Sequence, residues 1–251
     1  MKFIKIKIRP ILPPKTNIYP LFDEYLSKLK DGDVIFITSK ILAIHQGRCL
    51  KIEPRINKRK LIKQEAEKYI IGRKPAGKFI LSIKEHTLIP TSGIDESNGN
   101  GYYILWPQKP SLLAREVCEY LQKKSGVKKL AVIITDSHTT PLRYGVTGIS
   151  IGFFGLDPVY NYIGKEDIFG RKLKSTKTNI VDALAAMAVL LMGEGKEQTP
   201  IVILRNAKFI NFRRKSTYKR LVIPANQDIY SPLLKIFNKK NENHSNRRNQ
   251  H

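Results

Sequence analysis

Alternating and continuous apolar stretches along the chain predict a series of strands. Residues 1–10 alternate apolar and basic side chains with a period of two, which is typical of a strand with one buried face. Three short apolar runs follow turn residues, basic residues or a proline, at residues 34–37, 130–135 and 201–204. Runs of this kind predict strands that are buried on both faces, as in the interior of a covered sheet.

Two segments between these runs have the composition of helices. Residues 112–124 form one, and residues 179–192 form the other, which is rich in alanine and leucine and can be capped by Thr178 or Asn179. Strands that alternate with helices predict an α/β fold, and we expect a mixed sheet with α+β character. The 251 residues and 41% apolar content suffice for one compact core, built as a single unit or as two lobes.

Two glycine-rich stretches interrupt the regular pattern, at residues 91–101 and 145–155. The glycine spacing of the second differs from G-x-G-x-x-G, and the chain contains no Walker A motif. A nucleotide, if one binds, must therefore be held by another device. At the C-terminal end, residues 238–251 form a basic polar tail that we expect to be disordered, so the predicted domain covers residues 1–237.

The formal charge of +24 raises the question of a nucleic-acid partner, because clustered Lys and Arg neutralise phosphate. Here the 45 basic residues are spread through almost every segment, so nucleic-acid binding is an alternative that composition does not favour. The two cysteines are far apart and form no metal-binding or disulfide pattern, which fits a reducing cytoplasm. No apolar run approaches the ~20 residues of a membrane span.

Three acidic residues stand where a predicted buried element meets a loop. Asp136 follows a buried strand directly, Asp95 lies in the first glycine-rich stretch, and Glu194 follows the second helix. Such positions often line ligand sites in open α/β folds. Oxygen ligands without His or Cys suit Mg²⁺ or Mn²⁺, and Ser137 offers a hydroxyl beside Asp136. From spacing alone, helix capping and turn formation explain these acids more simply.

Other side chains could contribute to phosphate or carboxylate chemistry. Ser39 and Lys40 follow the first buried strand, where a hydroxyl and an ammonium could meet a phosphate, although a solvated lysine is an equally good explanation. Arg143 is a rigid bidentate donor and is our candidate for a catalytic residue. His138 is a weak candidate for a base, and Trp106, the sole tryptophan, is expected in the core.

From residue 32 to residue 205 the sequence resembles the coenzyme F420 γ-glutamyl ligase family. Any one of the shared motifs is weak evidence, but their common order is specific. The motifs are Gly32-Asp33-Val34, Ser39-Lys40-Ile41, Gly47-Arg48, Gly93-Ile94-Asp95-Glu96-Ser97-Asn98, Ile133-Ile134-Thr135-Asp136-Ser137, Arg143-Tyr144-Gly145-Val146-Thr147-Gly148, Gly152, Gly164-Lys165-Glu166-Asp167, Phe169-Gly170-Arg171-Lys172-Leu173 and Leu190-Leu191-Met192-Gly193-Glu194-Gly195.

The resemblance implies a GTP-dependent, homodimeric enzyme that forms an amide between L-glutamate and the terminal carboxylate of a coenzyme F420 precursor, through an acyl phosphate. It implies two Mg²⁺ or Mn²⁺ ions, a chemistry in which the protein mainly positions phosphates and charge. Asp95 and Asp136 would hold one ion, and Ser137 and Glu194 the other. The nucleotide would lie against Ser39, Lys40, Asn98, Met192, Gly193 and Gly195, with the rest of residues 192–199 and, more loosely, residues 11–14.

Three departures from the family pattern concern the acceptor side. The family's Thr-Phe-Gly-Arg-Pro-Trp-Arg is Ser137-His138-Thr139-Thr140-Pro141-Leu142-Arg143 here, its Asp-Pro-Asp is Lys109-Pro110-Ser111, and a lysine before Gly-Arg is Ile44 or His45. Another small carboxylic acid could therefore be the acceptor. The alternative function is a non-catalytic descendant that binds RNA or another polyanion. Convergence of the four expected metal ligands on one cleft would favour the enzyme.

Overall fold

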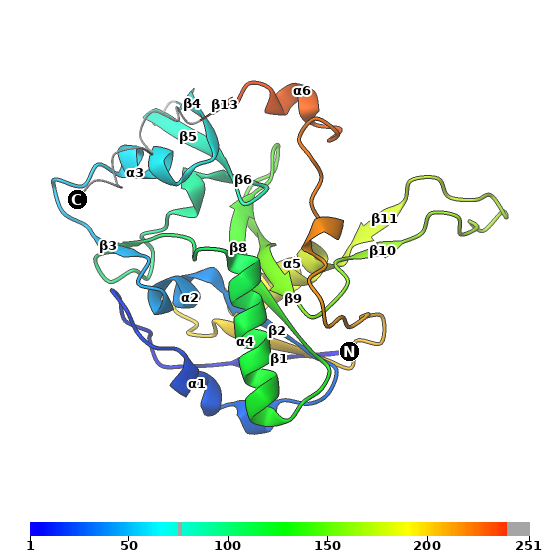
Figure 1. Ribbon diagram of the computed structural model, residues 1–251. Helices are drawn as coiled ribbons and strands as arrows, with labels where there is room; N and C mark the ends of the chain where they lie inside the picture. The colour runs from blue at the N-terminus through cyan, green and yellow to red at the C-terminus, as the bar shows by residue number, and fades with distance from the viewer. Residues whose placement is uncertain (75–76, 240–251) are drawn as a thin grey trace, which may run out of the picture.

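A computed structural model describes residues 1–74 and 77–239, and its centre is a five-stranded mixed sheet (Figure 1). The strands lie in the order β1 (Lys2–Ile6), β12 (Ile201–Arg205), β2 (Asp33–Thr38), β8 (Leu130–Thr139) and β9 (Val146–Phe154). Strands β2 and β8 pair in parallel, and every other neighbouring pair is antiparallel. The expected α/β fold with a mixed sheet is confirmed.

Each face of this sheet is covered by a helix, which explains the continuous apolar runs. On strand β2, Ile35 and Ile37 pack in a core cluster with α4 (Pro110–Ser125). Val34 and Phe36 alternate with them and pack in a second cluster with α5 (Ile180–Met192). Successive side chains of a strand point to opposite faces, so both faces must be apolar when both are covered.

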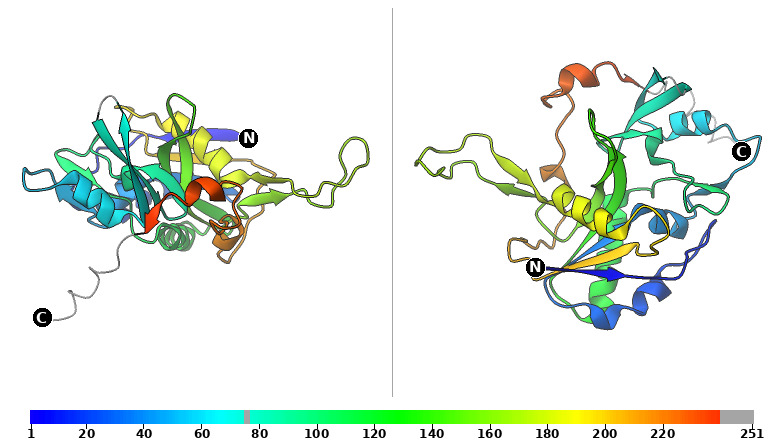
Figure 2. Two further views of the ribbon diagram at one scale, coloured as in Figure 1. Left: turned by 90° about the horizontal axis from the view of Figure 1, so that it is seen from above. Right: turned by 180° about the vertical axis from the view of Figure 1, so that it is seen from behind.

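A smaller lobe lies beside the central sheet and has its own antiparallel sheet (Figures 1 and 2). Its strands are β13 (Asn238–Lys239), β4 (Lys68–Lys74), β5 (Gly77–Lys84) and β6 (Thr87–Pro90), in that order. Helix α3 (Lys58–Glu65) contributes Leu61 and Ile62 to the apolar cluster of this lobe. Strand β13 extends ordered pairing two residues past the expected boundary at residue 237, and the rest of the expected tail lies outside the described residues.

Short elements connect the two sheets and project from them. The elements are α1 (Tyr19–Asp23), α2 (Ser39–His45), α6 (Ser231–Leu234), the paired strands β3 (Cys49–Lys51) and β7 (Tyr102–Ile104), the paired strands β10 (Val159–Asn161) and β11 (Lys177–Asn179), and the 3₁₀ turns Leu26–Lys28, Thr91–Gly93 and Tyr218–Arg220. Strands β10 and β11 begin an arm that extends away from the body (Figure 1). Within the described residues, every helix is too short or too polar to cross a membrane.

The second glycine-rich stretch is part of the sheet, so the expectation that it interrupts the regular pattern is wrong. It forms strand β9, whose glycines permit both helices to approach. A Cβ on Gly152 would lie 2.5 Å from the carbonyl carbon of Pro110 in α4. A Cβ on Gly148 would lie 2.4 Å from the carbonyl oxygen of Ala185 in α5. These glycines allow the helices to pack closely against the strand, a role that the spacing of glycines in the sequence does not reveal.

The expected helices are confirmed with small shifts at their ends. Helix α5 begins at Ile180, and Asn179 caps it by accepting a hydrogen bond from the backbone N–H of Asp182 at 3.1 Å. Helix α4 begins with Pro110 at a position where the missing N–H costs nothing, and it ends at Gly126 in the left-handed conformation.

A buried ion pair joins two central strands. The Asp33 side chain is fully buried and accepts two hydrogen bonds from the Arg205 guanidinium, at 2.8 and 2.7 Å. It also accepts the backbone N–H of Lys30 at 2.9 Å. Burial deprives the carboxylate of hydrating water, so it depends on the positive charge of Arg205 for compensation.

Replacing Arg205 by Gln should lower the free energy of unfolding by about 3–5 kcal/mol, because it leaves a buried carboxylate without its cation. Chemical denaturation of the purified variant measures this. Arg115→Gln is the matched control, since Arg115 pairs with Glu119 at the surface of α4, and it should cost at most about 0.5 kcal/mol. Equal, small losses in both variants would show that the Asp33 pair contributes no more than a surface pair.

Candidate active site

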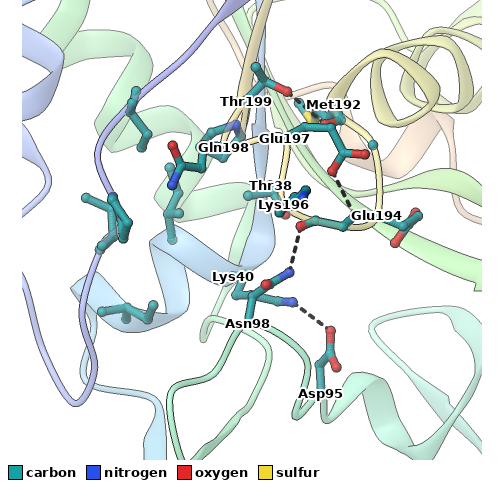
Figure 3. A pocket seen from close by; sticks show the side chains of 18 of the residues that line it. Thr38, Lys40, Asp95, Asn98, Met192, Glu194, Lys196, Glu197, Gln198 and Thr199 are labelled. Atoms are coloured by element: carbon teal, nitrogen blue, oxygen red, sulfur yellow. Dashed lines mark hydrogen bonds and ion pairs between the residues drawn. The ribbon is translucent and has the colours of Figure 1, made fainter.

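A cavity of about 540 Å³ lies at one edge of the central sheet, where segments far apart in the sequence meet (Figure 3). The chain after β1 forms one wall with residues 8–12, and the start of α2 forms another. Residues 193–200, between α5 and β12, close the cavity from a third side. Strand β8 contributes Asp136, and the loop after the Thr91–Gly93 turn contributes Asp95.

The structure brings nearly all of the expected site residues to this one cavity. The residues that line it are Lys40, Asp95, Asn98, Asp136, Ser137, Met192, Gly193, Glu194 and Gly195. Two expected residues are elsewhere. Ser39 is 5% exposed at the start of α2 and does not line the cavity, and Arg143 is exposed in the turn between β8 and β9. The expected roles of these two residues stay predictions.

Asp136 occupies the deepest acidic position, on strand β8. Its Oδ2 accepts the indole N–H of Trp106, and its Oδ1 accepts the backbone N–H of Ser137 at 2.9 Å. Desolvation by burial raises the pKa of Asp136 to about 6, against the opposing effect of these two hydrogen bonds, and the negative charge of Asp95 adds to the rise. This carboxyl group therefore lies where an additional positive charge would stabilise its ionised form.

Asp95 is held in its loop by a lysine and by its own turn. Lys40 Nζ lies 2.8 Å from Asp95 Oδ2, and Ser97 donates its backbone N–H to Asp95 Oδ1 at 2.8 Å. Burial opposes ionisation, but the hydrogen bond and charge of Lys40 lower the pKa of Asp95 below its ordinary value. Lys40 also donates to the backbone carbonyl of Ser97 at 2.7 Å, which fixes its ammonium at this edge of the cavity.

Glu194 completes the group of acids around Lys40. Burial raises its pKa, the positive charge of Lys40 opposes that rise, and the negative charge of Asp95 adds to it. The ammonium of Lys40 likewise lowers the pKa of Asp136. One lysine thus acts electrostatically on three carboxyl groups that the chain supplies from three separate segments.

The loop after α5 is stiffened by bonds within itself and to the Asp95 loop. Glu197 accepts the backbone N–H of Gly195 at 2.8 Å, and Thr199 donates to the Met192 carbonyl at 2.7 Å. Asn98 donates its side-chain amide to the Gly195 carbonyl at 3.1 Å, which ties the loop to the opposite wall (Figure 3). Such glycine-containing loops present backbone groups that can surround a phosphate.

The donors fit a divalent cation by their chemistry. Asp95, Asp136, Glu194 and the Ser137 hydroxyl offer the hard oxygen ligands that Mg²⁺ and Mn²⁺ prefer. In the part of the chain that the structure describes, no three acidic, histidine or cysteine side chains are grouped closely enough to hold an ion as they stand. Lys40 instead provides positive charge, so a bound ion would have to share or replace its contact with Asp95.

Sequence reasoning missed some of the cavity wall. Residues 8–10 and Thr38 line it, although they belong to none of the motifs from which site residues were predicted. Trp106 is buried, as expected, with 1% of its surface exposed. Its hydrogen bond to Asp136 could not be read from the sequence, because the two residues lie 30 positions apart.

The departures from the family pattern fall differently around the cavity. Ile44 lines it, so an apolar side chain stands in the wall near the position of the family lysine. His45 faces Tyr19, with the ring centroids 5.2 Å apart. Lys109 precedes α4 in a left-handed conformation and does not line the cavity, and neither does His138 on β8. The changes that touch the cavity directly are therefore those at Ile44 and at Ser137, where the family has threonine.

Comparison with known proteins agrees with the geometry. The model of the family described as F420-0:Gamma-glutamyl ligase matches residues 9–206. The coenzyme F420:L-glutamate ligase of Methanosarcina mazei is 31% identical over an alignment 261 positions long, which covers 96% of this chain and 100% of the relative. The protein of the same name from Methanocaldococcus jannaschii is 31% identical over 233 residues, covering 85% of this chain and 90% of the relative. The resemblance is confirmed, and the chain belongs to the F420-0:gamma-glutamyl ligase family.

Proposed function

We propose that this protein is a ligase that uses GTP to join L-glutamate to the carboxylate of a coenzyme F420 precursor or a related small carboxylic acid. The names of its relatives support the ligase reaction and its substrates. The observation that carries the proposal is the convergence of Asp95, Asp136, Ser137 and Glu194 with Lys40 on one cavity. A triphosphate in that cavity would meet an ammonium, loop amides and acidic side chains suited to its counterions.

The proposed reaction has two steps. A carboxylate oxygen of the acceptor attacks the γ-phosphorus of GTP, the bond to the β-phosphate oxygen breaks, and GDP leaves. The amine of glutamate then attacks the acyl carbon of the acyl phosphate, loses a proton, and expels inorganic phosphate as the amide forms. Each step needs reactants held in line and charge held in place more than it needs an acid or base from the protein.

The cavity residues supply that positioning. Lys40 would bind a phosphate oxygen, and Asn98 with residues 193–199 would orient the nucleotide. Asp95 and Asp136 would hold one Mg²⁺ or Mn²⁺ ion, and Ser137 with Glu194 a second. When bound, these ions would neutralise the triphosphate charge. The cytoplasmic location expected for such an enzyme is part of the same proposal.

Binding of RNA or another polyanion is not favoured as the main function. That alternative would gain if the four expected ligand residues were scattered, but all four line the same cavity. The high positive charge is therefore compatible with the enzyme and is not needed to explain the site.

Purified protein with GTP, Mg²⁺ or Mn²⁺, L-glutamate and the F420 precursor should release GDP and yield a product heavier by one glutamate residue. Nucleotide chromatography and mass spectrometry measure the two products together. GDP formation that requires the acceptor, and that reaches about one turnover before glutamate is added, supports the acyl phosphate route. Folded protein that forms no amide with the precursor or other small carboxylic acids, under any of these conditions, would contradict the proposal.

In the same assay, Lys40→Met should lower kcat/KM by about 100-fold or more, because it removes a fixed positive charge from the phosphoryl group in flight. Lys123→Met is the matched control: Lys123 is exposed on α4, outside the cavity, and its loss should change kcat/KM less than twofold. Equal reductions of kcat/KM in both variants would show that Lys40 has no specific role in the reaction.

Asp136→Asn should abolish ligation and yet stabilise the protein without ligands. Burial raises the folded-state pKa of Asp136 above that of a free aspartate, to about 6. Stability from this group is thus fully present below the unfolded pKa of about 4 and is lost as pH rises through about 6. Denaturation should show the variant more stable than wild type by about 1–3 kcal/mol at pH 8, with the difference vanishing near pH 4. A variant that is less stable than wild type at pH 8 would show that the ionised Asp136 carboxylate does not destabilise the folded protein.

A homodimer is part of the proposal, and an exposed apolar surface supports it. A hollow between β9 and α5 adjoins the cavity at Gly193 and Glu194, and it includes Leu190, which is 76% exposed. Exposed apolar patches commonly mark protein interfaces. A second copy of the chain would remove this surface from water.

Leu190→Glu should therefore convert the dimer to a monomer, halving the mass measured by light scattering. Leu233→Glu is the control, because Leu233 is 63% exposed on α6 and does not line the hollow. Its mass should equal that of wild type. A monomeric wild type, or a dimeric Leu190→Glu variant at micromolar concentration, would reject this interface.

A further inference from the structure

Trp106, the sole tryptophan of the chain, does not line the cavity but contacts Asp136, which does. Trp106 follows β7 and packs in the core cluster shared with α4. Its indole N–H donates to Oδ2 of Asp136, and the Oδ1 atom of the same carboxylate accepts the backbone N–H of Ser137 at 2.9 Å. Each carboxylate oxygen therefore has one fixed donor, and each keeps a lone pair for another partner.

The indole also touches the loop that carries the other aspartate. A Cβ on Gly93 would lie 2.2 Å from Trp106 Nε1, so only glycine leaves room for the ring nitrogen there. Gly93 has a φ of +70°, a conformation that also favours glycine. It lies two residues before Asp95. One ring thus contacts Asp136 through a hydrogen bond and abuts the backbone leading to Asp95.

The tryptophan is held in place by Arg48, which precedes β3, and by Lys84 and Glu65 of the smaller lobe. Arg48 donates from Nε to the Trp106 carbonyl oxygen at 3.2 Å, and Lys84 Nζ lies 5.8 Å from the indole centroid. Both cations share one oxygen of Glu65, each at 2.6 Å. These groups leave the indole little freedom to turn, so its N–H is aimed before any ligand arrives.

A neutral donor suits this position. A lysine or arginine in place of Trp106, hydrogen-bonded to Asp136, would compete with a metal ion for the negative charge of the carboxylate more directly than Lys40, which pairs with Asp95. An indole N–H is uncharged, so it orients the carboxylate and leaves its full charge available.

We propose that Trp106 is a positioning residue that fixes the Asp136 carboxylate relative to the Asp95 loop, so that both acids can hold one divalent cation. The inference rests on the proposed function, which gives Asp95 and Asp136 that role. It goes further by assigning the placement of the ligand to a residue outside the cavity wall, with the smaller lobe as its support.

Trp106→Phe keeps an aromatic ring and removes the N–H. Titration of the folded variant with Mn²⁺, with free ion measured by electron paramagnetic resonance, should show affinity weakened by about 10–100-fold, the usual effect of losing a partner of a ligand. In ligation assays the apparent KM for Mn²⁺ should rise to the same extent while the KM for glutamate stays unchanged. Purely structural damage would not produce this split.

Two further variants separate positioning from packing. Phe36→Leu alters a fully buried aromatic in the opposite core cluster; it should lower the melting temperature and leave Mn²⁺ affinity within twofold of wild type. Gly93→Ala keeps Trp106 but pushes its nitrogen away, and it should weaken Mn²⁺ binding as Trp106→Phe does. This second route remains informative if Trp106→Phe fails to fold.

Fluorescence of the wild-type protein gives a direct signal, because Trp106 is the only tryptophan in the chain. Mn²⁺ should quench its emission with the same midpoint as the resonance titration, and Asp136→Asn should remove that quenching. Wild-type Mn²⁺ affinity in folded Trp106→Phe overturns the positioning role and leaves the ligase proposal standing. Failure of wild type to bind Mn²⁺, or undiminished binding by Asp136→Asn, overturns the metal site and the role of Trp106 with it.

Discussion

The candidate active site depends on the gathering of three carboxyl groups around one ammonium at the edge of the central sheet. Like charges repel, and burial disfavours ionisation, so Asp136 and Glu194 have raised pKa values although Lys40 stands near them. Such an arrangement is costly for stability and useful for binding cations and phosphate. The rest of the fold supplies the rigidity that keeps these groups together.

That rigidity comes from two directions. Strand β8 is paired with β2 up to Thr135 and with β9 beyond it, and helices cover both faces of the sheet; this places Asp136 and Ser137. On the other side, Trp106 contacts Asp136 and is held by Arg48, which precedes β3, and by Lys84 of the smaller lobe. The smaller lobe does not line the cavity, but through Trp106 it limits the movement of an acid that the central sheet positions.

A glycine-rich segment can indicate a phosphate-binding loop, but in β9 the glycines allow α4 and α5 to pack closely on the sheet. Gly148 and Gly152 in β9 admit the helix backbones, and the loop glycine Gly193 turns the chain beyond α5 with a φ of +79°. The first two serve packing and the third shapes the cavity. Their different uses follow from position in the fold, because the residue type is the same.

The sequence by itself determined β1, β2, β8 and β12 of the central sheet and both long helices, because burial imposes periodic apolar patterns on the chain. It also indicated the acids at the ends of these elements, but it missed β9, whose glycines hide the apolar pattern. It could not determine the smaller lobe, whose strands carry many basic residues and show no strong period. Only the tertiary structure decided that Arg143 lies in an exposed turn, that Lys40 pairs with Asp95, and that Trp106 reaches Asp136. These relations join residues from separate segments, and their distances exist only once the chain has packed.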